Sequence, residues 1–279
     1  MKNTLLIFAL FLSSAVYCQH YYNDIVDASD LGQRMENYIN QKVRTVTATG
    51  FDERGVKSTD FNERIEIDAP NKTLKIATRN GQTISRNTYR FDDQYRLIGI
   101  SDSSRDIKST THYNYDNRGS ILSIINTTRD SLNDFTQTTA HYYQYNDAGK
   151  PVRLWRVINQ ADSTEYRFTI DEKGNVADEQ LYRRGVSMDL MYYYYNDKNQ
   201  LTDIVRYDKK TKKLLPVTMF EYDETGRVIQ KMSVLSTNRP DYIIWRYIFN
   251  EKGLKTKEAL FNKQKELTGR IEYAYTFEN

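Results

Sequence analysis

The sequence has little of what most enzymes and metalloproteins need. Its 279 residues include one cysteine and three histidines. It contains no G-x-S-x-G, no H-E-x-x-H, no glycine-rich phosphate loop and no cysteine pair. These absences argue against a serine hydrolase, a zinc protease and a nucleotide-binding enzyme. We therefore expect a protein that is not an enzyme and that needs no cofactor.

A charge excess of one sign is also missing. The 40 Lys and Arg residues nearly balance the 37 Asp and Glu residues, and the two signs are interleaved along the chain. A nucleic-acid-binding face requires a basic cluster or stripe, and none stands apart here. We expect no nucleic-acid partner.

The first eighteen residues have the pattern of an export signal. A charged start precedes an apolar stretch, residues 5–12, that is too short to span a bilayer. Cleavage before Gln19 is favoured and cleavage after Ala15 stays open, which assigns residues 1–18 to the signal. We expect location in the periplasm, on the cell surface or outside the cell. A membrane contact is expected only if Cys18 is lipidated, and a tyrosine precedes it where lipoprotein signals have a small residue.

What the chain does have is tyrosine, 23 residues of it, arranged in a recurring phrase. In residues 113–121, Tyr113 and Tyr115 alternate as they would on one face of a strand. Asp116 and Gly119 follow, and Ile121 begins the next apolar run. An Asp at the first position of a type I turn binds its own backbone, and Gly three residues later accepts a positive φ. The phrase predicts a β-hairpin with a glycine bulge.

The phrase returns along the whole chain. The position three after the acid or amide is Gly or Asn in eight of nine copies and Tyr95 in the remaining one. Later copies are 24 to 30 residues apart, which leaves room for two strands and an outer turn in each unit. The copies span residues 49–56, 65–71, 89–97, 113–121, 143–149, 168–176, 193–201, 220–228 and 247–254, and a half copy without a turn ends the chain at 273–277.

The repeats predict an all-β fold: a long antiparallel meander of roughly eighteen strands that forms a curved or spiralling sheet over residues 48–279. The aromatic residue before each acid should pair with the apolar residue two after Gly, as Tyr115 with Ile121 and Tyr222 with Val228. Residues 19–47 are assigned to a linker and a short capping helix. The helix should begin near Asp30 and cover an open end of the sheet with Leu31, Met35, Tyr38 and Ile39.

The phrase Tyr-x-Tyr-Asp-x-x-Gly-x-aliphatic resembles the YD repeat of Rhs-type proteins, over about residues 50–277. The resemblance implies a spiralling β-sheet on an exported or surface protein, with carbohydrate binding or enclosure of a toxin domain as associated functions. This chain has longer, more degenerate units and no toxin-like segment after Phe277. It therefore resembles a short stand-alone member of the family.

Candidate binding residues come from the surplus of aromatic side chains. Alternation places tyrosines of residues 192–195 on both faces of a strand, so one face could present a ladder that stacks on sugar rings. We take Trp155, Tyr192, Tyr194 and Trp245 as candidate ligand-binding residues. His112 and His141 should face opposite ways and no metal site is expected. The repeated acids are expected to cap turns.

These features favour a secreted, non-enzymatic repeat protein that binds glycans or envelope proteins through a Tyr-rich sheet. An alternative is a structural protein that pairs with other chains through exposed strand edges. An outer-membrane β-barrel is a further alternative, although charges interrupt strands on both faces, where a barrel needs a continuous apolar band.

Overall fold

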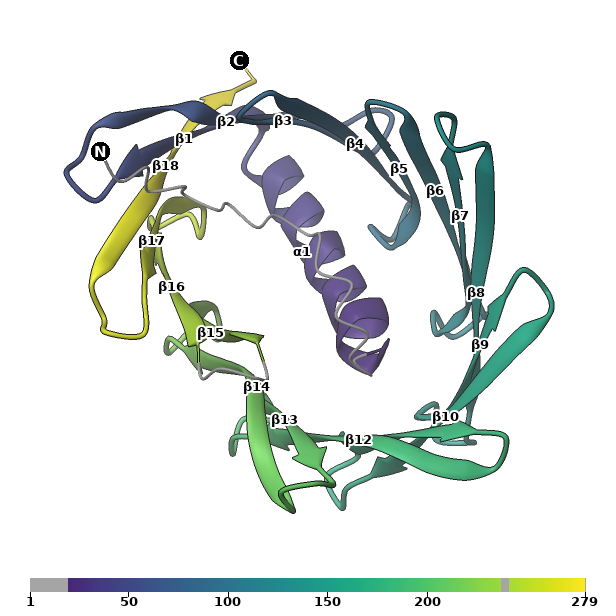
Figure 1. Ribbon diagram of the computed structural model, residues 1–279. Coiled ribbons are helices and arrows are strands. Elements are labelled where there is room, and N and C mark those ends of the chain that lie inside the picture. Colours follow the sequence, from purple (N-terminus) through teal and green to yellow (C-terminus); the bar gives the residue numbers. More distant parts are fainter. Residues whose placement is uncertain (1–19, 237–240, 279) are drawn as a thin grey trace.

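The computed structural model describes residues 20–236 and 241–278, and the predicted export signal with Cys18 lies outside this range. The chain forms eighteen antiparallel strands and one N-terminal helical segment (Figure 1). The prediction of an all-β meander with a short helix is confirmed. The helical segment consists of a π-helical turn, η1 (Tyr21–Val26), and the helix α1 (Asp27–Asn40).

Each strand pairs with the next along the chain, and β1 also pairs with β18, so the sheet closes into a barrel. The sequence had left open whether the sheet is open, spiral or closed. The strands are β1 (Val43–Asp52), β2 (Lys57–Asp68), β3 (Thr73–Asn80), β4 (Thr83–Phe91), β5 (Leu97–Ser104), β6 (Ile107–Tyr115), β7 (Ile121–Asp130), β8 (Phe135–Tyr145), β9 (Pro151–Ile158), β10 (Asp162–Ile170), β11 (Val176–Arg183), β12 (Val186–Tyr195), β13 (Leu201–Asp208), β14 (Lys213–Tyr222), β15 (Val228–Ser236), β16 (Asp241–Phe249), β17 (Lys255–Phe261) and β18 (Leu267–Phe277).

The recurring turns have one geometry. In the copy at Asp116, the amide of Gly119 donates to the Asp116 carbonyl at 3.1 Å, and the carboxylate accepts from the backbone amides of Arg118 and Ser120. Gly119, Gly149, Gly174 and Gly226 all have φ between +73° and +87° and lie at chain reversals, as predicted. The predicted cross-turn pairs are present too, because Tyr115 pairs with Ile121 and Tyr222 with Val228.

Three of the recurring turns have neither Gly nor Asn in the left-handed position. Tyr95 adopts the same turn as the glycines, with φ +57°, so that copy has the common shape and carries the strain of a bulky residue there. In the second copy Lys72, and not Asn71, has the positive φ. A tenth turn of this kind, which the sequence analysis missed, begins at Asn262 and has Lys265 in the left-handed position.

The second tyrosine of the phrase ties neighbouring units together. Its hydroxyl donates to the backbone carbonyl of the residue that begins the preceding strand, as from Tyr115 on β6 to Leu97 on β5 at 2.7 Å. The same bond recurs from Tyr145 to Ile121, Tyr195 to Val176, Tyr222 to Leu201 and Tyr275 to Lys255. The first tyrosine of each phrase thus packs in the core, and the second forms the hydrogen bond between neighbouring units.

Helix α1 lies inside the barrel (Figure 1). It contacts the recurring turns at one end of the barrel. Gly32 permits this position, because a Cβ there would lie 2.5 Å from the Tyr95 carbonyl oxygen. Asn37 donates to the Gly253 carbonyl on another turn at that end. The glycine that lowers intrinsic helix propensity therefore lets the helix approach the wall closely.

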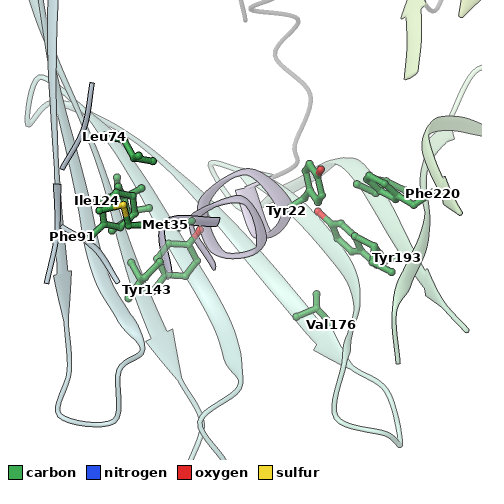
Figure 2. Close-up of a cluster of buried hydrophobic side chains, with 14 of the residues drawn as sticks. Tyr22, Met35, Leu74, Phe91, Ile124, Tyr143, Val176, Tyr193 and Phe220 are labelled. Atoms are coloured by element: carbon green, nitrogen blue, oxygen red, sulfur yellow. The ribbon is translucent and has the colours of Figure 1, made fainter. Parts of the chain in front are cut away.

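The main core fills the space between the helical segment and the inner wall (Figure 2). Met35 is fully buried, and Tyr22 packs against Phe220 from β14. A smaller second cluster lies between β1, β2, β17 and β18. Because the strands alternate, the residues between the buried ones form the outer face, and that face is largely polar. Among the described residues, no helix is both long and apolar enough to cross a membrane.

Candidate functional site

Glu179 on β11 fixes the beginning of the helical segment to the barrel wall. Its side chain is fully buried and accepts the backbone amides of His20 and Tyr21, each at 3.1 Å, and the Tyr193 hydroxyl at 2.8 Å. The first amides of a helix have no partner within the helix, and no side chain of the segment caps them. The wall carboxylate supplies that cap and complements the positive end of the helix dipole. Burial raises the pKa of Glu179.

A second ionisable group, on β15, contacts the helical segment at another place. Lys231 on β15 lies over the rings of Tyr22 and Phe220, with its ammonium 5.5 Å and 5.7 Å from their centroids. Burial lowers the pKa of Lys231, and the negative charges of Asp27 and Asp30 oppose that change. Burial also raises the pKa of Asp27 to about 6. The segment is therefore bound to two sides of the wall through buried ionisable groups.

A pocket of about 480 Å³ lies between the helical segment and the turns of four successive repeat units. Ser29, Gln33 and Glu36 of α1 form one side, and the turns that follow β4, β6, β8 and β10 form the other. We call it the end pocket. Its aromatic lining consists of Tyr21, Tyr95, Tyr115 and Tyr145.

The end pocket has a rigid floor and a mixed polar rim. The hydroxyls of Tyr115 and Tyr145 are committed to backbone carbonyls, which fixes their rings. The Arg96 guanidinium lies 4.8 Å from the Tyr115 ring centroid and pairs with Asp92. Gln94, Lys150 and Asn175 also line the pocket. Apolar rings with a few convergent polar groups are typical of small-molecule sites.

The structure does not bring the four predicted binding residues together. Tyr193 and Leu154 are buried in the lumen, so their neighbours Tyr192, Tyr194 and Trp155 face outward. Tyr194 is 44% exposed. Trp155 lies on β9 and the two tyrosines on β12, with two strands between them.

Trp245 has the opposite orientation. It pairs with Leu260 and packs against the second core cluster, on the inner side of the wall. The four candidate binding residues are therefore divided between two faces of the sheet. His112 and His141 do face opposite ways, as the sequence indicated: His112 pairs with Ile125 on the outer face, and His141 lies inside against Asp24.

The sequence analysis missed the inward-facing acids. Glu179 has the same strand parity as the inward-facing Leu181. A charged residue at such a core position was the sequence signal that could have identified it. Asp24 belongs to a segment taken as a linker. It accepts hydrogen bonds from Tyr143 at 2.8 Å and forms a 2.6 Å contact with His141 Nδ1. Burial would raise the pKa of Asp24, but the charge of His141 and its hydrogen bond lower it overall. The pKa of His20 falls to about 3 because the ring is buried.

No protein-family model matches this sequence, and no curated protein matches it. Among solved structures, a porin-like protein from Bacteroides uniformis is 11% identical with a TM-score of 0.45, covering 85% of this chain and 97% of that one. A porin-like protein from Bacteroides vulgatus is 10% identical with a TM-score of 0.31, covering 84% and 99%.

A chain of the Photorhabdus luminescens Tc holotoxin pore is 12% identical with a TM-score of 0.36. The match covers 78% of this chain and 12% of that much longer one. Similarity at these levels supports no inference about activity. The sequence and the geometry agree on a β-rich repeat fold, which over the described residues closes into an eighteen-stranded barrel.

Proposed function

We propose that this chain is an exported, non-enzymatic β-barrel of the cell envelope that binds a short carbohydrate in its end pocket. The supporting observation is the end pocket itself, where fixed tyrosine rings stand beside amide and charged side chains. Sugar rings present apolar faces and hydroxyl edges, which suit such a lining. This transfers the predicted glycan site from the outer face to the interior end.

Tyr95 gives independent support for a binding role. It occupies a position where most copies have Gly or Asn and adopts φ +57°, which costs of order 1 kcal/mol or more. Strain of this kind persists where the side chain is needed, and the Tyr95 ring lines the pocket beside α1.

The test compares two tyrosine variants. Short oligosaccharides selected on a glycan array are titrated calorimetrically into wild type, Tyr95→Asn and Tyr194→Ala. We expect Tyr95→Asn to weaken binding at least tenfold with little change in Tm, because relief of backbone strain offsets the lost ring contacts. Tyr194→Ala, on the outer face, should bind as wild type does. Absence of any sugar ligand, or loss of binding in Tyr194→Ala alone, contradicts the proposal.

A membrane-spanning barrel is the second candidate. Its support is an outward row of apolar residues on adjacent strands, in which Met219 pairs with Met232, Met232 with Ile244, and Ile244 with Phe261. Elsewhere the outer face carries ion pairs: Arg64 with Glu66 on β2, Glu165 with Arg167 on β10, and Arg270 with Glu272 on β18.

Lipid-facing surfaces need an apolar band on every strand, because charges at mid-membrane cost several kcal/mol. We therefore favour an aqueous location in the envelope. Cell fractionation distinguishes the two candidates. An aqueous envelope protein should be released without detergent and be monodisperse. A membrane-spanning barrel should be extracted from outer membranes only by detergent.

The proposed pairing through strand edges loses its basis in this fold. β1 and β18 are hydrogen-bonded to each other over nine residue pairs, so neither is an edge strand among the described residues.

A further inference from the structure

A cluster of metal-ligating side chains lies where the helical segment meets the wall, and none of its three residues lines the end pocket. The cluster consists of His20, at the start of the segment, Asp24, one turn later, and His141 on β8. One ligand atom from each residue lies within 4.8 Å of the other two. His141 Nδ1 is 2.6 Å and His20 Nδ1 is 3.9 Å from Asp24 Oδ2.

We propose that His20, Asp24 and His141 bind one divalent transition-metal ion, of the zinc or cobalt class, that fastens the helical segment to the barrel wall. Two imidazoles and a carboxylate suit such ions, which hold N and O ligands at about 2.0–2.2 Å. Ligands on such an ion are about 3 to 3.5 Å apart, so small side-chain movements from the observed distances suffice. A spacing of four residues on a helical turn places His20 and Asp24 on the same face.

The carboxylate is oriented from outside the cluster, because the Tyr143 hydroxyl donates to Asp24 at 2.8 Å. Metal-bound side chains are commonly held by such outer hydrogen bonds.

The surrounding charges set the expected strength of binding. Arg156 pairs with His141 across β8 and β9, and its positive charge acts on His20 and opposes a dication. Glu179, which binds the His20 amide, adds a carboxylate nearby. With one ligating carboxylate and an opposing guanidinium, we expect a dissociation constant in the micromolar range rather than the nanomolar affinity of closed structural zinc sites.

The experiment uses the exported mature chain, stripped with EDTA and free of any affinity tag. Cobalt is titrated in while visible absorption is recorded, and zinc is tested by its effect on Tm. We expect one equivalent of cobalt with an absorption spectrum of a nitrogen- and oxygen-ligated ion. Zinc at one hundred times its dissociation constant should raise Tm by about 5 °C.

Variants separate a specific site from general binding. His141→Ala should lower cobalt affinity at least tenfold and abolish the Tm shift, whereas His112→Ala, which removes the histidine on the outer face, should do neither. Asp24→Asn keeps an acceptor for Tyr143 and provides a second test if His141→Ala fails to fold. Binding of less than a fifth of an equivalent by wild type, or equal losses in the His112→Ala variant, overturns the proposal.

Discussion

Replacement of Glu179 by alanine tests how the helical segment is held. The change leaves two backbone donors without their acceptor, the amides of His20 and Tyr21. Each unsatisfied buried donor costs about 1–3 kcal/mol. Loss of a buried carboxylate regains part of this, because its burial is itself unfavourable. We expect a net destabilisation of about 2–4 kcal/mol.

The loss of stability should affect the helical segment before the whole protein. Glu179 binds the start of the segment, and the barrel strands keep their own hydrogen bonds to one another. Hydrogen exchange measured by mass spectrometry should therefore accelerate over residues 20–40 by about 30- to 1000-fold. This factor is the increase in the equilibrium constant for local opening that corresponds to about 2–4 kcal/mol. Urea unfolding followed by tryptophan fluorescence measures the global effect.

Asp178→Ala is the matched control, because Asp178 precedes Glu179 on β11 and faces outward, with Thr169 as its hydrogen-bond partner. Surface changes of this kind stay within about 0.5 kcal/mol. If Glu179→Ala falls in that range, or exchange over residues 20–40 does not change, then Glu179 does not anchor the segment and the reasoning is refuted.

Three further changes test other contacts. Gly32→Ala should displace α1 and lower Tm, although alanine is the better helix former, because its Cβ would meet the Tyr95 carbonyl; an unchanged Tm would show that the wall yields. Asp27→Asn should stabilise the protein above pH 6 and remove the gain that wild type shows as pH falls from 6 to 4. The native pKa of about 6 exceeds the unfolded value of 3.8, so between these pH values the folded state binds the proton more tightly and gains stability. Parallel stability–pH curves for wild type and Asp27→Asn would contradict this. Asp116→Asn should fold with near wild-type stability at pH 7, because other copies use Asn, whereas Asp116→Ala should lower Tm because two turn amides lose their acceptor. Hydrogen bonds from backbone amides, first that of Ser120, lower the pKa of the Asp116 carboxylate. Its contribution to stability is therefore present above about pH 4 and is lost as pH falls through the lowered pKa. Identical acid denaturation of the Asn variant and wild type would argue against this role.

The recurring hairpins could be predicted because their determinants are local. A Gly or Asn that accepts positive φ, an Asp or Asn that binds amides two and four residues later, and alternating aromatics all act within about nine residues. Local signals were also misleading where another residue takes up the strained conformation, as Tyr95, Lys72 and Lys265 do, since nothing in their chemistry favours it.

Alternation alone does not show which face of each strand points into the barrel. Leu154-Trp155 and Ile244-Trp245 read alike in sequence, yet Trp155 faces outward and Trp245 inward. Both faces of these strands carry apolar residues, and bulges, such as the one between Arg90 and Phe91 opposite β5, shift the parity from strand to strand.

The sequence by itself thus determined the approximate strand count, most of the turns and the cross-turn pairs, because each depends on backbone preferences of neighbouring residues. Only the tertiary structure decided that the sheet closes and that the helical segment enters it. β1 meets β18 through pairs such as Val46 with Tyr275, and Glu179 meets Tyr21 across 158 residues. Contacts between residues so far apart depend on the accumulated twist and coiling of the whole sheet, which no short stretch of the chain encodes.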